Sequence, residues 1–258
     1  MGINPAGCRA AIVAAHPDDE TIGAGEYLRR LASPAIIHVT DGAPRDMKDA
    51  REGGFRSREE YAQARRREFL ESLRAGGVRV SEAISLDYID QEASLHLVEL
   101  ARDLCRLFGR LKLRLVLTHP YEGGHPDHDA TAFAVQAACQ LLPAALRPQI
   151  IEFTSYHDCA GQMETGVFLP EGEASQVILK LDAEARARKE RMLACYRTQE
   201  RVIRHFSARE ERFRPAPAYD FVKPPHSGEL FYEHFSWGMT SRRWTDLARV
   251  AADSLSMR

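Results

Sequence analysis

The chain has 258 residues, of which 44% are hydrophobic and 28% charged, and its formal net charge is −2. This length accommodates one sizeable α/β domain with a substantial core. The small net charge gives no electrostatic argument for a nucleic acid or an anionic membrane as partner. No apolar run approaches the roughly 20 residues that a membrane-spanning helix needs, so no membrane span is expected.

The N-terminus and the cysteines bear on the cellular location. Residues 1–10 lack a basic segment followed by a long apolar core, so no secretion signal is expected. Five cysteines, the first of them Cys8, are scattered without a Cys-x-x-Cys pair, which suits reduced thiols. We therefore expect a cytoplasmic protein.

Short apolar runs alternate with helical patterns through the first part of the chain. The runs predicted as strands are 10–15, 35–40, 83–86, 113–118 and 150–155. The segments predicted as helices are 20–31, 58–75, 95–108 and 129–142. Continuous apolar strands that alternate with helices are typical of a parallel sheet covered on both faces, so the predicted fold class is α/β with a mostly parallel sheet.

After residue 160 this alternation weakens. A charged helix is predicted over 181–196, and the proline-rich segment 214–225 is predicted to be extended rather than a regular element. We expect a single domain over 1–258, with a core at about 9–160. The irregular C-terminal extension, 161–258, is expected to cover the sheet edge or to wall the active site.

Two acidic turns that contain histidine each follow a predicted strand. The first reads Ala-His-Pro-Asp-Asp-Glu over 15–20, and the second reads Gly-His-Pro-Asp-His-Asp over 124–129. Ligands of open parallel sheets bind beyond the carboxyl ends of the strands, so both turns are expected at one rim, together with Asp41-Gly42 after the second strand. Imidazole and carboxylate ligands suit Zn²⁺ and the neighbouring first-row metals.

The spacing inside the first turn suggests a division of roles. His16 and Asp19 are three residues apart, which brings both side chains to one point, while Asp18 projects differently and is free to act as a base. His125 or His128 supplies a third ligand and leaves a coordination position open. A metal-dependent hydrolase is the leading interpretation. Taken singly, the carboxylates are equally typical of a helix entrance and the histidines of a polar loop.

These two turns resemble the signatures of the PIG-L deacetylase family, also called LmbE-like, whose members remove acetyl groups from compounds that contain N-acetylglucosamine. The segment 40–42 (Thr-Asp-Gly) matches a lesser family feature, and the resemblance covers about residues 9–155. It implies a Rossmann-like three-layer sandwich and a zinc cofactor, with Fe²⁺ or another divalent transition metal as an alternative. It also implies a small-molecule amino-sugar substrate or glycoconjugate, and a homo-oligomer is compatible with it.

The resemblance implies roles for individual residues. The implied zinc ligands are His16, Asp19 and His128. The general base falls on Asp18, and the histidine that stabilises the transition state falls on His125. Asp127 resembles the carboxylate that orients this histidine, and we expect it to raise the pKa of His125 so that the imidazole is protonated.

Further positions are candidates for substrate binding. Arg65 and Asp90 resemble an arginine and an aspartate that hold the sugar in the family. Family members often carry a tyrosine shortly before the second signature, and here Tyr121 lies four residues before His125. The pair 123–124 (Gly-Gly) is expected to give the loop room for substrate. In the C-terminal third, His226 is the one candidate site residue.

Three other interpretations remain. An amidase that cleaves a larger acyl group, for example from a thiol-sugar conjugate, would use the same chemistry. A non-catalytic metal-dependent sugar-binding protein would keep the ligands without turnover. A Rossmann-like dinucleotide binder is disfavoured, because the first turn offers acidic groups where a pyrophosphate needs glycines and backbone amides.

Overall fold

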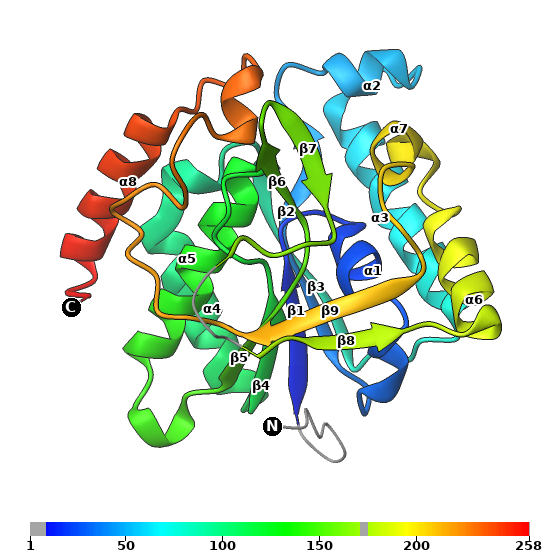
Figure 1. Ribbon diagram of the computed structural model, residues 1–258, viewed down its shortest axis with the longest axis horizontal. Coiled ribbons are helices and arrows are strands. Elements are labelled where there is room, and N and C mark those ends of the chain that lie inside the picture. The colour runs from blue at the N-terminus through cyan, green and yellow to red at the C-terminus, as the bar shows by residue number, and fades with distance from the viewer. Residues whose placement is uncertain (1–8, 171–174, 258) are drawn as a thin grey trace.

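The computed structural model describes residues 9–170 and 175–257, so that Cys8 lies outside the described part of the chain. A seven-stranded sheet stands between two layers of helices, as Figure 1 shows. Its strands are β1 (Ala10–Ala14), β2 (Ala35–Pro44), β3 (Glu82–Asp90), β4 (Leu115–Thr118), β5 (Gln149–Phe153), β8 (Val177–Lys180) and β9 (Glu210–Pro215). The predicted α/β class with a mostly parallel sheet is confirmed.

The strand order places the turns that follow β1 and β4 side by side. The sheet runs β3-β2-β1-β4-β5-β9-β8; the first five strands in this order are parallel, whereas β9 and β8 are antiparallel to their neighbours. From β1 the chain moves outward to β2 and β3, and then returns across β1 to form β4. This reversal is a topological switch point, where the loops diverge and leave a crevice at the carboxyl ends of the strands.

Side chains along each strand alternate between the two faces of the sheet, and each face packs against one layer of helices. In β1, Ile12 and Ala14 belong to a core with α1 and α3, whereas Ala11 and Val13 belong to a core with α4, α5 and α8. The helices are α1 (Asp19–Ala24), α2 (Lys48–Glu52), α3 (Arg58–Gly76), α4 (Leu97–Leu111), α5 (Pro126–Leu141), α6 (Ala183–Leu193), α7 (Glu200–Ile203) and α8 (Ser241–Ser254). Short 3₁₀ turns lie at Tyr27–Arg30, Ala93–His96, Ala144–Leu146, Arg197–Gln199 and Phe231–His234.

Several predicted boundaries are wrong, and two of the errors matter for the site. The second strand continues past Asp41-Gly42 to Pro44, with register shifts against β3 that pattern reading could not detect. The third strand extends to Asp90, because its pairing with the longer β2 continues to that residue. The first helix is shorter than predicted: α1 ends at Ala24 and a 3₁₀ turn follows.

The C-terminal part is more regular than the sequence indicated. Two strands, β8 and β9, extend the sheet, and β9 includes the first two residues of the segment predicted to be irregular. A hairpin of β6 (Tyr156–Cys159) and β7 (Gln162–Thr165) stands apart from the sheet. Helix α8 packs Trp244, Ala248 and Ala251 into the same core as α4 and α5.

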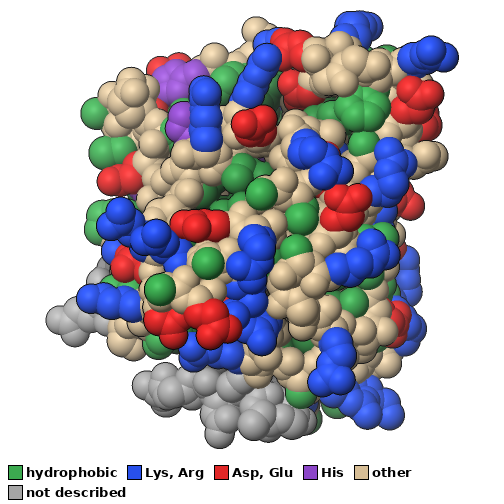
Figure 2. All heavy atoms as spheres, turned by 90° about the vertical axis from the view of Figure 1, so that its right-hand side faces the viewer, with side chains coloured by type: hydrophobic (Ala, Val, Ile, Leu, Met, Phe, Trp, Pro, Cys, Tyr) green, Lys and Arg blue, Asp and Glu red, His purple; other side chains and the backbone are tan. Residues whose placement is uncertain are grey.

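One face of the molecule carries mixed charges. On the face formed by the α3 and α6 side, positive and negative side chains are interspersed, as Figure 2 shows. Within residues 9–170 and 175–257, no helix has both the length and the apolar content that a bilayer crossing requires. The four cysteines of these residues are all free.

Glycine is required at position 124, where the loop after β4 passes β6. A Cβ atom built on Gly124 would lie 1.9 Å from the backbone oxygen of Tyr156. The expectation that this glycine makes room for substrate is therefore wrong, because a neighbouring backbone fills the space.

We predict that Gly124→Ala lowers the free energy of unfolding by about 1–3 kcal/mol, because the backbone of β6 must move to admit the methyl group. Gly109→Ala in α4 is the control: nothing lies within 4 Å of its added Cβ, and the helix gains about 0.5–1 kcal/mol. Denaturant titration of both variants measures the difference. Equal stability of the two variants would contradict the close approach at Gly124.

Candidate active site

The turn after β1 is closed by its own acidic side chains. The backbone N–H of His16 donates to Asp19 Oδ2 at 2.8 Å, and the N–H of Asp18 donates to Glu20 Oε2 at 3.2 Å. Asp18 has φ 155° and ψ −31°, a conformation that costs energy in any residue other than glycine. The turn therefore holds a strained backbone at Asp18, which is a feature common in functional sites.

The turn after β4 begins helix α5. His125 is the N-cap, and its Nδ1 accepts a hydrogen bond from the N–H of Asp127 at 3.1 Å. Pro126 stands at the start of the helix, where its missing N–H costs no hydrogen bond. His128 follows in the first turn of α5 and points its Nε2 at Asp19 Oδ1, 3.3 Å away. The two turns thus meet through Asp19.

Asp19 joins the two imidazoles that the resemblance assigns as metal ligands. His16 Nδ1 lies 3.2 Å from Asp19 Oδ2, and His128 Nε2 lies 3.3 Å from the other oxygen. All three side chains are buried. Burial favours the neutral carboxyl, but His128 holds the pKa of Asp19 well below its usual range. Two imidazole nitrogens around an ionised carboxylate form a donor set that fits Zn²⁺.

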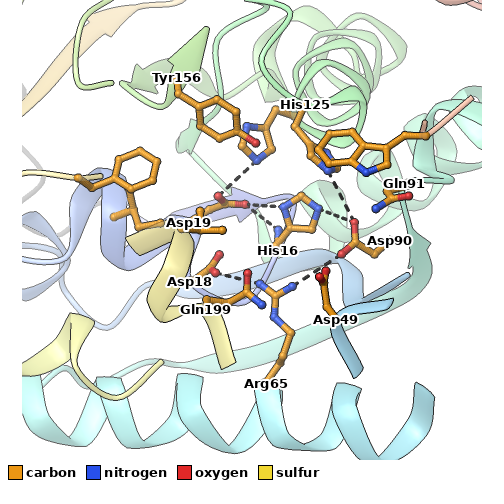
Figure 3. A pocket seen from close by; sticks show the side chains of 15 residues that line it. His16, Asp18, Asp19, Asp49, Arg65, Asp90, Gln91, His125, Tyr156 and Gln199 are labelled. Atoms are coloured by element: carbon orange, nitrogen blue, oxygen red, sulfur yellow. Dashed lines mark hydrogen bonds and ion pairs between the residues drawn. The ribbon is translucent and has the colours of Figure 1, made fainter. Parts of the chain in front are cut away.

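The second ring nitrogen of each of these two histidines also lies within hydrogen-bonding distance of a partner. His16 Nε2 lies 3.1 Å from Asp90 Oδ1 and 3.3 Å from Asp127 Oδ2, as Figure 3 shows for Asp90. His128 Nδ1 lies 3.2 Å from the hydroxyl of Ser155. Partners of this kind fix the orientation of metal-binding imidazoles and increase their basicity. The arrangement therefore leaves His16 Nδ1 and His128 Nε2 directed at the two carboxylate oxygens of Asp19.

Other groups of buried donors overlap this set. Donor atoms lie within 4.8 Å of one another in the groups His16/His125/His128, His16/Asp90/His125/Asp127 and Asp19/His119/His128. His119 Nε2 already accepts the N–H of Ala15 at 3.0 Å, which occupies its lone pair. His125 Nδ1 is likewise occupied by a backbone N–H, and the carboxylate of Asp127 accepts two more. Hydrogen bonding thus leaves His16 Nδ1 and His128 Nε2 facing Asp19, each toward a different carboxylate oxygen. None of the three compact groups above holds all three of these residues.

Asp18 lies beside this set and faces Arg65. Burial raises the pKa of Asp18 to about 8, although the guanidinium of Arg65 acts in the opposite direction. Arg65 Nη2 donates to Asp18 Oδ2 at 2.9 Å (Figure 3). Its Nη1 donates to the carbonyl oxygen of Gly42 at 2.7 Å. Arg65 therefore contacts the predicted base directly, in addition to lining the site.

The environment of His125 differs from the sequence-based expectation. Burial and the neighbouring His16 hold the pKa of His125 well below its usual value. The carboxylate of Asp127 is 4.0 Å from His125 Nδ1 and lies closer to His16. The expected protonated His125, supported by Asp127, is therefore wrong. Because Nδ1 accepts a hydrogen bond, His125 is a neutral imidazole that carries its proton on Nε2.

A buried network around Glu20 was not predicted. Glu20 Oε2 contacts His38 Nε2 at 2.9 Å, and Glu20 Oε1 accepts the hydroxyl of Tyr196 at 2.6 Å. His38 lies in β2, and Tyr196 comes from the C-terminal part. The side chain of Glu20 also accepts the N–H of Asp18. The strained turn therefore depends on a residue 176 positions away from Glu20, which no local pattern reveals.

Three further candidates lie away from the donor set. The hydroxyl of Tyr121 donates to the carbonyl oxygen of Lys223, and its ring packs in the core beside Trp244. Asp41 pairs with Arg58 and does not line the cavity of about 120 Å³ that opens onto the donor set. His226 does not line it either, and its role in substrate binding stays a prediction.

A cavity of about 120 Å³, which we call the inner cavity, opens onto the donor set. Buried polar residues form much of its wall, and four residues after position 160 contribute to it as well. The lining residues are His16, Asp18, Asp19, Ile22, Asp49, Arg65, Asp90, Gln91, His125, His128, Tyr156, Gln199, Val202, Phe206 and Trp237. That residues 161–258 wall an active site stays a prediction.

Comparison with known proteins identifies the family. The family model described as GlcNAc-PI de-N-acetylase, PIG-L, matches residues 11–139, which is half of the chain. The chain therefore belongs to the PIG-L family. A probable N-acetyl-alpha-D-glucosaminyl L-malate deacetylase 2 from Bacillus cereus is 27% identical over 143 residues, which cover 54% of this chain and 64% of that relative. The match thus spans less than two thirds of the relative's length.

Solved structures share the fold at low sequence identity. A deacetylase of the teicoplanin biosynthesis pathway has a TM-score of 0.62 at 19% identity and covers 82% of this chain and 99% of its own. The N,N'-diacetylchitobiose deacetylase of Pyrococcus horikoshii has a TM-score of 0.57 at 21% identity, with coverages of 87% and 90%. A 4-carboxy-2-hydroxymuconate hydratase from Pseudomonas putida has a TM-score of 0.53 at 18% identity, with coverages of 76% and 82%. The fold alone therefore does not determine the reaction.

We predict that Tyr196→Phe lowers the free energy of unfolding by about 1–3 kcal/mol, because the buried carboxylate of Glu20 loses a short hydrogen bond. Tyr88→Phe is the matched control, since its hydroxyl donates to Asp103 at 2.9 Å in a half-buried position and its loss costs at most about 1 kcal/mol. Thermal and denaturant unfolding measure both. A smaller loss for Tyr196→Phe than for Tyr88→Phe would contradict the importance of this network.

Proposed function

We propose that this protein is a zinc-dependent N-deacetylase that removes an acetyl group from a small molecule or glycoconjugate containing N-acetylglucosamine. The main support is the convergence of His16 and His128 on the carboxylate of Asp19, with Asp18 beside them. Membership of the PIG-L family and the names of the similar deacetylases support the reaction and the substrate class. A hydratase with a similar fold shows that the fold alone does not support one particular reaction.

The donor set determines which metals the site could hold. His16, Asp19 and His128 would bind Zn²⁺ through two nitrogens and a carboxylate, and Fe²⁺ is compatible with the same ligands. When bound there, the metal supplies Lewis acidity, which polarises the amide carbonyl and makes water nucleophilic near neutral pH. In this proposal the protein contributes the geometry, the base and the donor to the developing negative charge.

Asp18 is the proposed general base. Its carboxylate takes a proton from the attacking water and then delivers that proton to the departing amine nitrogen, which releases acetate and the free amino sugar. Its pKa of about 8, raised by burial, suits a group that must both accept and return a proton. Arg65 holds the carboxylate in place at 2.9 Å and favours its ionised form.

His125 is the proposed donor to the carbonyl oxygen as negative charge develops there. The backbone N–H of Asp127 occupies Nδ1, so that Nε2 carries the proton and can donate. The ring of Trp237 lies 4.7 Å from the ring of His125 and helps to hold it. Asp90, which lines the inner cavity, remains a candidate to hold a sugar hydroxyl.

We predict that His16→Ala loses the metal, because one of three ligands is gone, whereas Asp18→Asn keeps the metal and loses at least about 100-fold in kcat. His96→Ala removes an exposed histidine outside the cavity and should change neither. Elemental analysis gives the metal content, and free amine released from N-acetylglucosamine derivatives gives the turnover. Equal metal loss in His16→Ala and Asp18→Asn would refute this division of roles, and tight sugar binding without turnover would favour a non-catalytic binding protein.

A second prediction follows from the contact between Arg65 and Asp18. Asp18 acts in its ionised form, and Arg65 lowers its pKa, so Arg65→Met should raise the pKa and shift the acidic limb of the kcat/KM profile upward by about one pH unit or more. Arg65→Lys retains the charge and should shift the limb less. A limb that stays in place or moves to lower pH in Arg65→Met would show that Asp18 does not control it.

A further inference from the structure

A second, larger cavity adjoins the inner one, and we call it the outer cavity. Its volume is about 510 Å³, against about 120 Å³ for the inner cavity. The two share five lining residues, Asp49, Gln91, Tyr156, Val202 and Trp237. A ligand bound at the donor set can therefore extend into the outer cavity without leaving the protein surface.

Aromatic and apolar side chains make up much of the outer cavity. They are Tyr156, Met163, Val202, Phe231, Phe235 and Trp237. The rings of Phe235 and Trp237 are stacked, with centroids 4.4 Å apart and an interplanar angle of 12°. Phe235 is nevertheless 41% exposed and Val202 is 40% exposed. Apolar surface that is held in place but left open to solvent is typical of a ligand-binding wall.

Trp237 connects this wall to the proposed chemistry. Its ring stacks on Phe235 on the side of the outer cavity and lies 4.7 Å from the ring of His125 at the inner cavity. In Figure 3 the residues of the inner cavity surround His16 and Asp19, and the ring of Tyr156 packs against that of His128, with centroids 5.3 Å apart. Both Trp237 and Tyr156 therefore stand at the junction of the two cavities.

The charged residues of the outer cavity do not favour an anionic ligand. Lys48 and Arg201 are accompanied by Asp46 and Asp49 in the same lining, and Arg201 is paired with Glu52 at 2.6 Å. His205 is the one further basic group of this lining. A strongly acidic group attached to the sugar would find little excess of positive charge here, whereas a flat apolar group would find the stacked rings.

The size of the cavities indicates which end of the substrate extends outward. The amide has an acyl side and an amine side, and one of them must share the small inner cavity with the donor set. If acetyl is the acyl group, as in the function proposed above, it is the smaller side and belongs in the inner cavity. The amine side, which is the sugar and whatever it carries, then lies toward the outer cavity.

We propose that the outer cavity binds an aromatic aglycone carried by the amino sugar, with Phe235 and Trp237 as its stacking wall. This inference rests on the proposed deacetylase function for the direction of the substrate. The six apolar lining residues all lie after residue 139, beyond the segment that the family model matches. The site for the aglycone is thus a feature of this chain's C-terminal part.

Tryptophan fluorescence tests binding without turnover. The chain has two tryptophans, and Trp244 is fully buried while Trp237 lines the outer cavity. The probes are the phenyl and methyl glycosides of glucosamine, which lack the acetyl group and cannot be deacetylated. We expect the phenyl glycoside to change the Trp237 emission and to bind about tenfold more tightly than the methyl glycoside. Trp237→Phe should remove the signal, and Phe235→Ala should remove the preference.

Leu146→Ala is the control, because Leu146 is 55% exposed and lies outside both cavities; it should keep the tenfold preference. Equal affinity of the unaltered protein for the two glycosides would overturn the inference, whatever the enzymatic activity. Preferential binding of the phenyl glycoside by a protein that deacetylates neither N-acetyl derivative would support the aglycone site and refute the proposed reaction instead.

Kinetics on the metal-loaded protein complete the test. With the N-acetyl forms of both glycosides, Phe235→Ala should raise KM for the phenyl substrate about tenfold and reduce the preference for it over the methyl substrate, whereas Leu146→Ala should leave kcat/KM for both substrates unchanged. A methyl glycoside with an N-hexanoyl group distinguishes the other direction of binding. If that longer acyl chain improves kcat/KM and the phenyl group does not, the outer cavity receives the acyl side and the inference is wrong.

Discussion

The carboxylate of Asp19 is the interaction on which the rest of the site depends. It lies between His16 of its own turn and His128 of a turn more than a hundred residues away, at 3.2 and 3.3 Å. This meeting is possible only because β1 pairs in parallel with β4, with Ala10 opposite Leu115. Adjacent parallel strands present their carboxyl ends at the same edge, and at a topological switch point the loops that follow them enclose a crevice. The donor set is thus a consequence of strand order, and the helices that cover the sheet keep it buried.

Burial makes the electrostatics of this crevice strongly interdependent. Burial favours neutral forms, but charge pairing overrides it at Asp19 and at Asp90, whose pKa values both lie well below the usual range. Asp18 shows the opposite balance, since burial prevails over its contact with Arg65 and its pKa is raised. The pKa values of these adjacent carboxyl groups are therefore shifted in opposite directions. Asp19 is ionised, as a metal ligand must be, whereas Asp18 can exchange a proton. The proposed mechanism requires this division of roles.

The C-terminal part both supports the turn that carries Asp18 and shapes the approach to it. Tyr196 donates to Glu20, which in turn accepts the N–H of the strained Asp18. Val202 and Trp237 line both cavities, and the stacked pair of Phe235 and Trp237 lies against the proposed path of the substrate. The family model ends at residue 139, before all of these contributions. Most of the residues that line the outer cavity therefore lie outside the part of the chain that the family model matches.

Local pattern was enough to predict the α/β class, the parallel core strands and the two histidine-containing turns, because apolar runs and the His-Pro-Asp motifs are properties of short segments. The full length of β2 and β3, which carries Asp90 to the rim, depends on pairing between strands and was not predicted. The protonation of His125 was predicted wrongly, because a backbone N–H and the burial of neighbouring charges determine it. Local pattern also did not predict the network of Glu20, His38 and Tyr196 or the aromatic wall at Trp237, because both depend on contacts that form only in the packed chain. The sequence alone determined which chemical groups are available; the tertiary structure decided which of them meet, since contacts between distant segments and the exclusion of water arise only when the chain is packed.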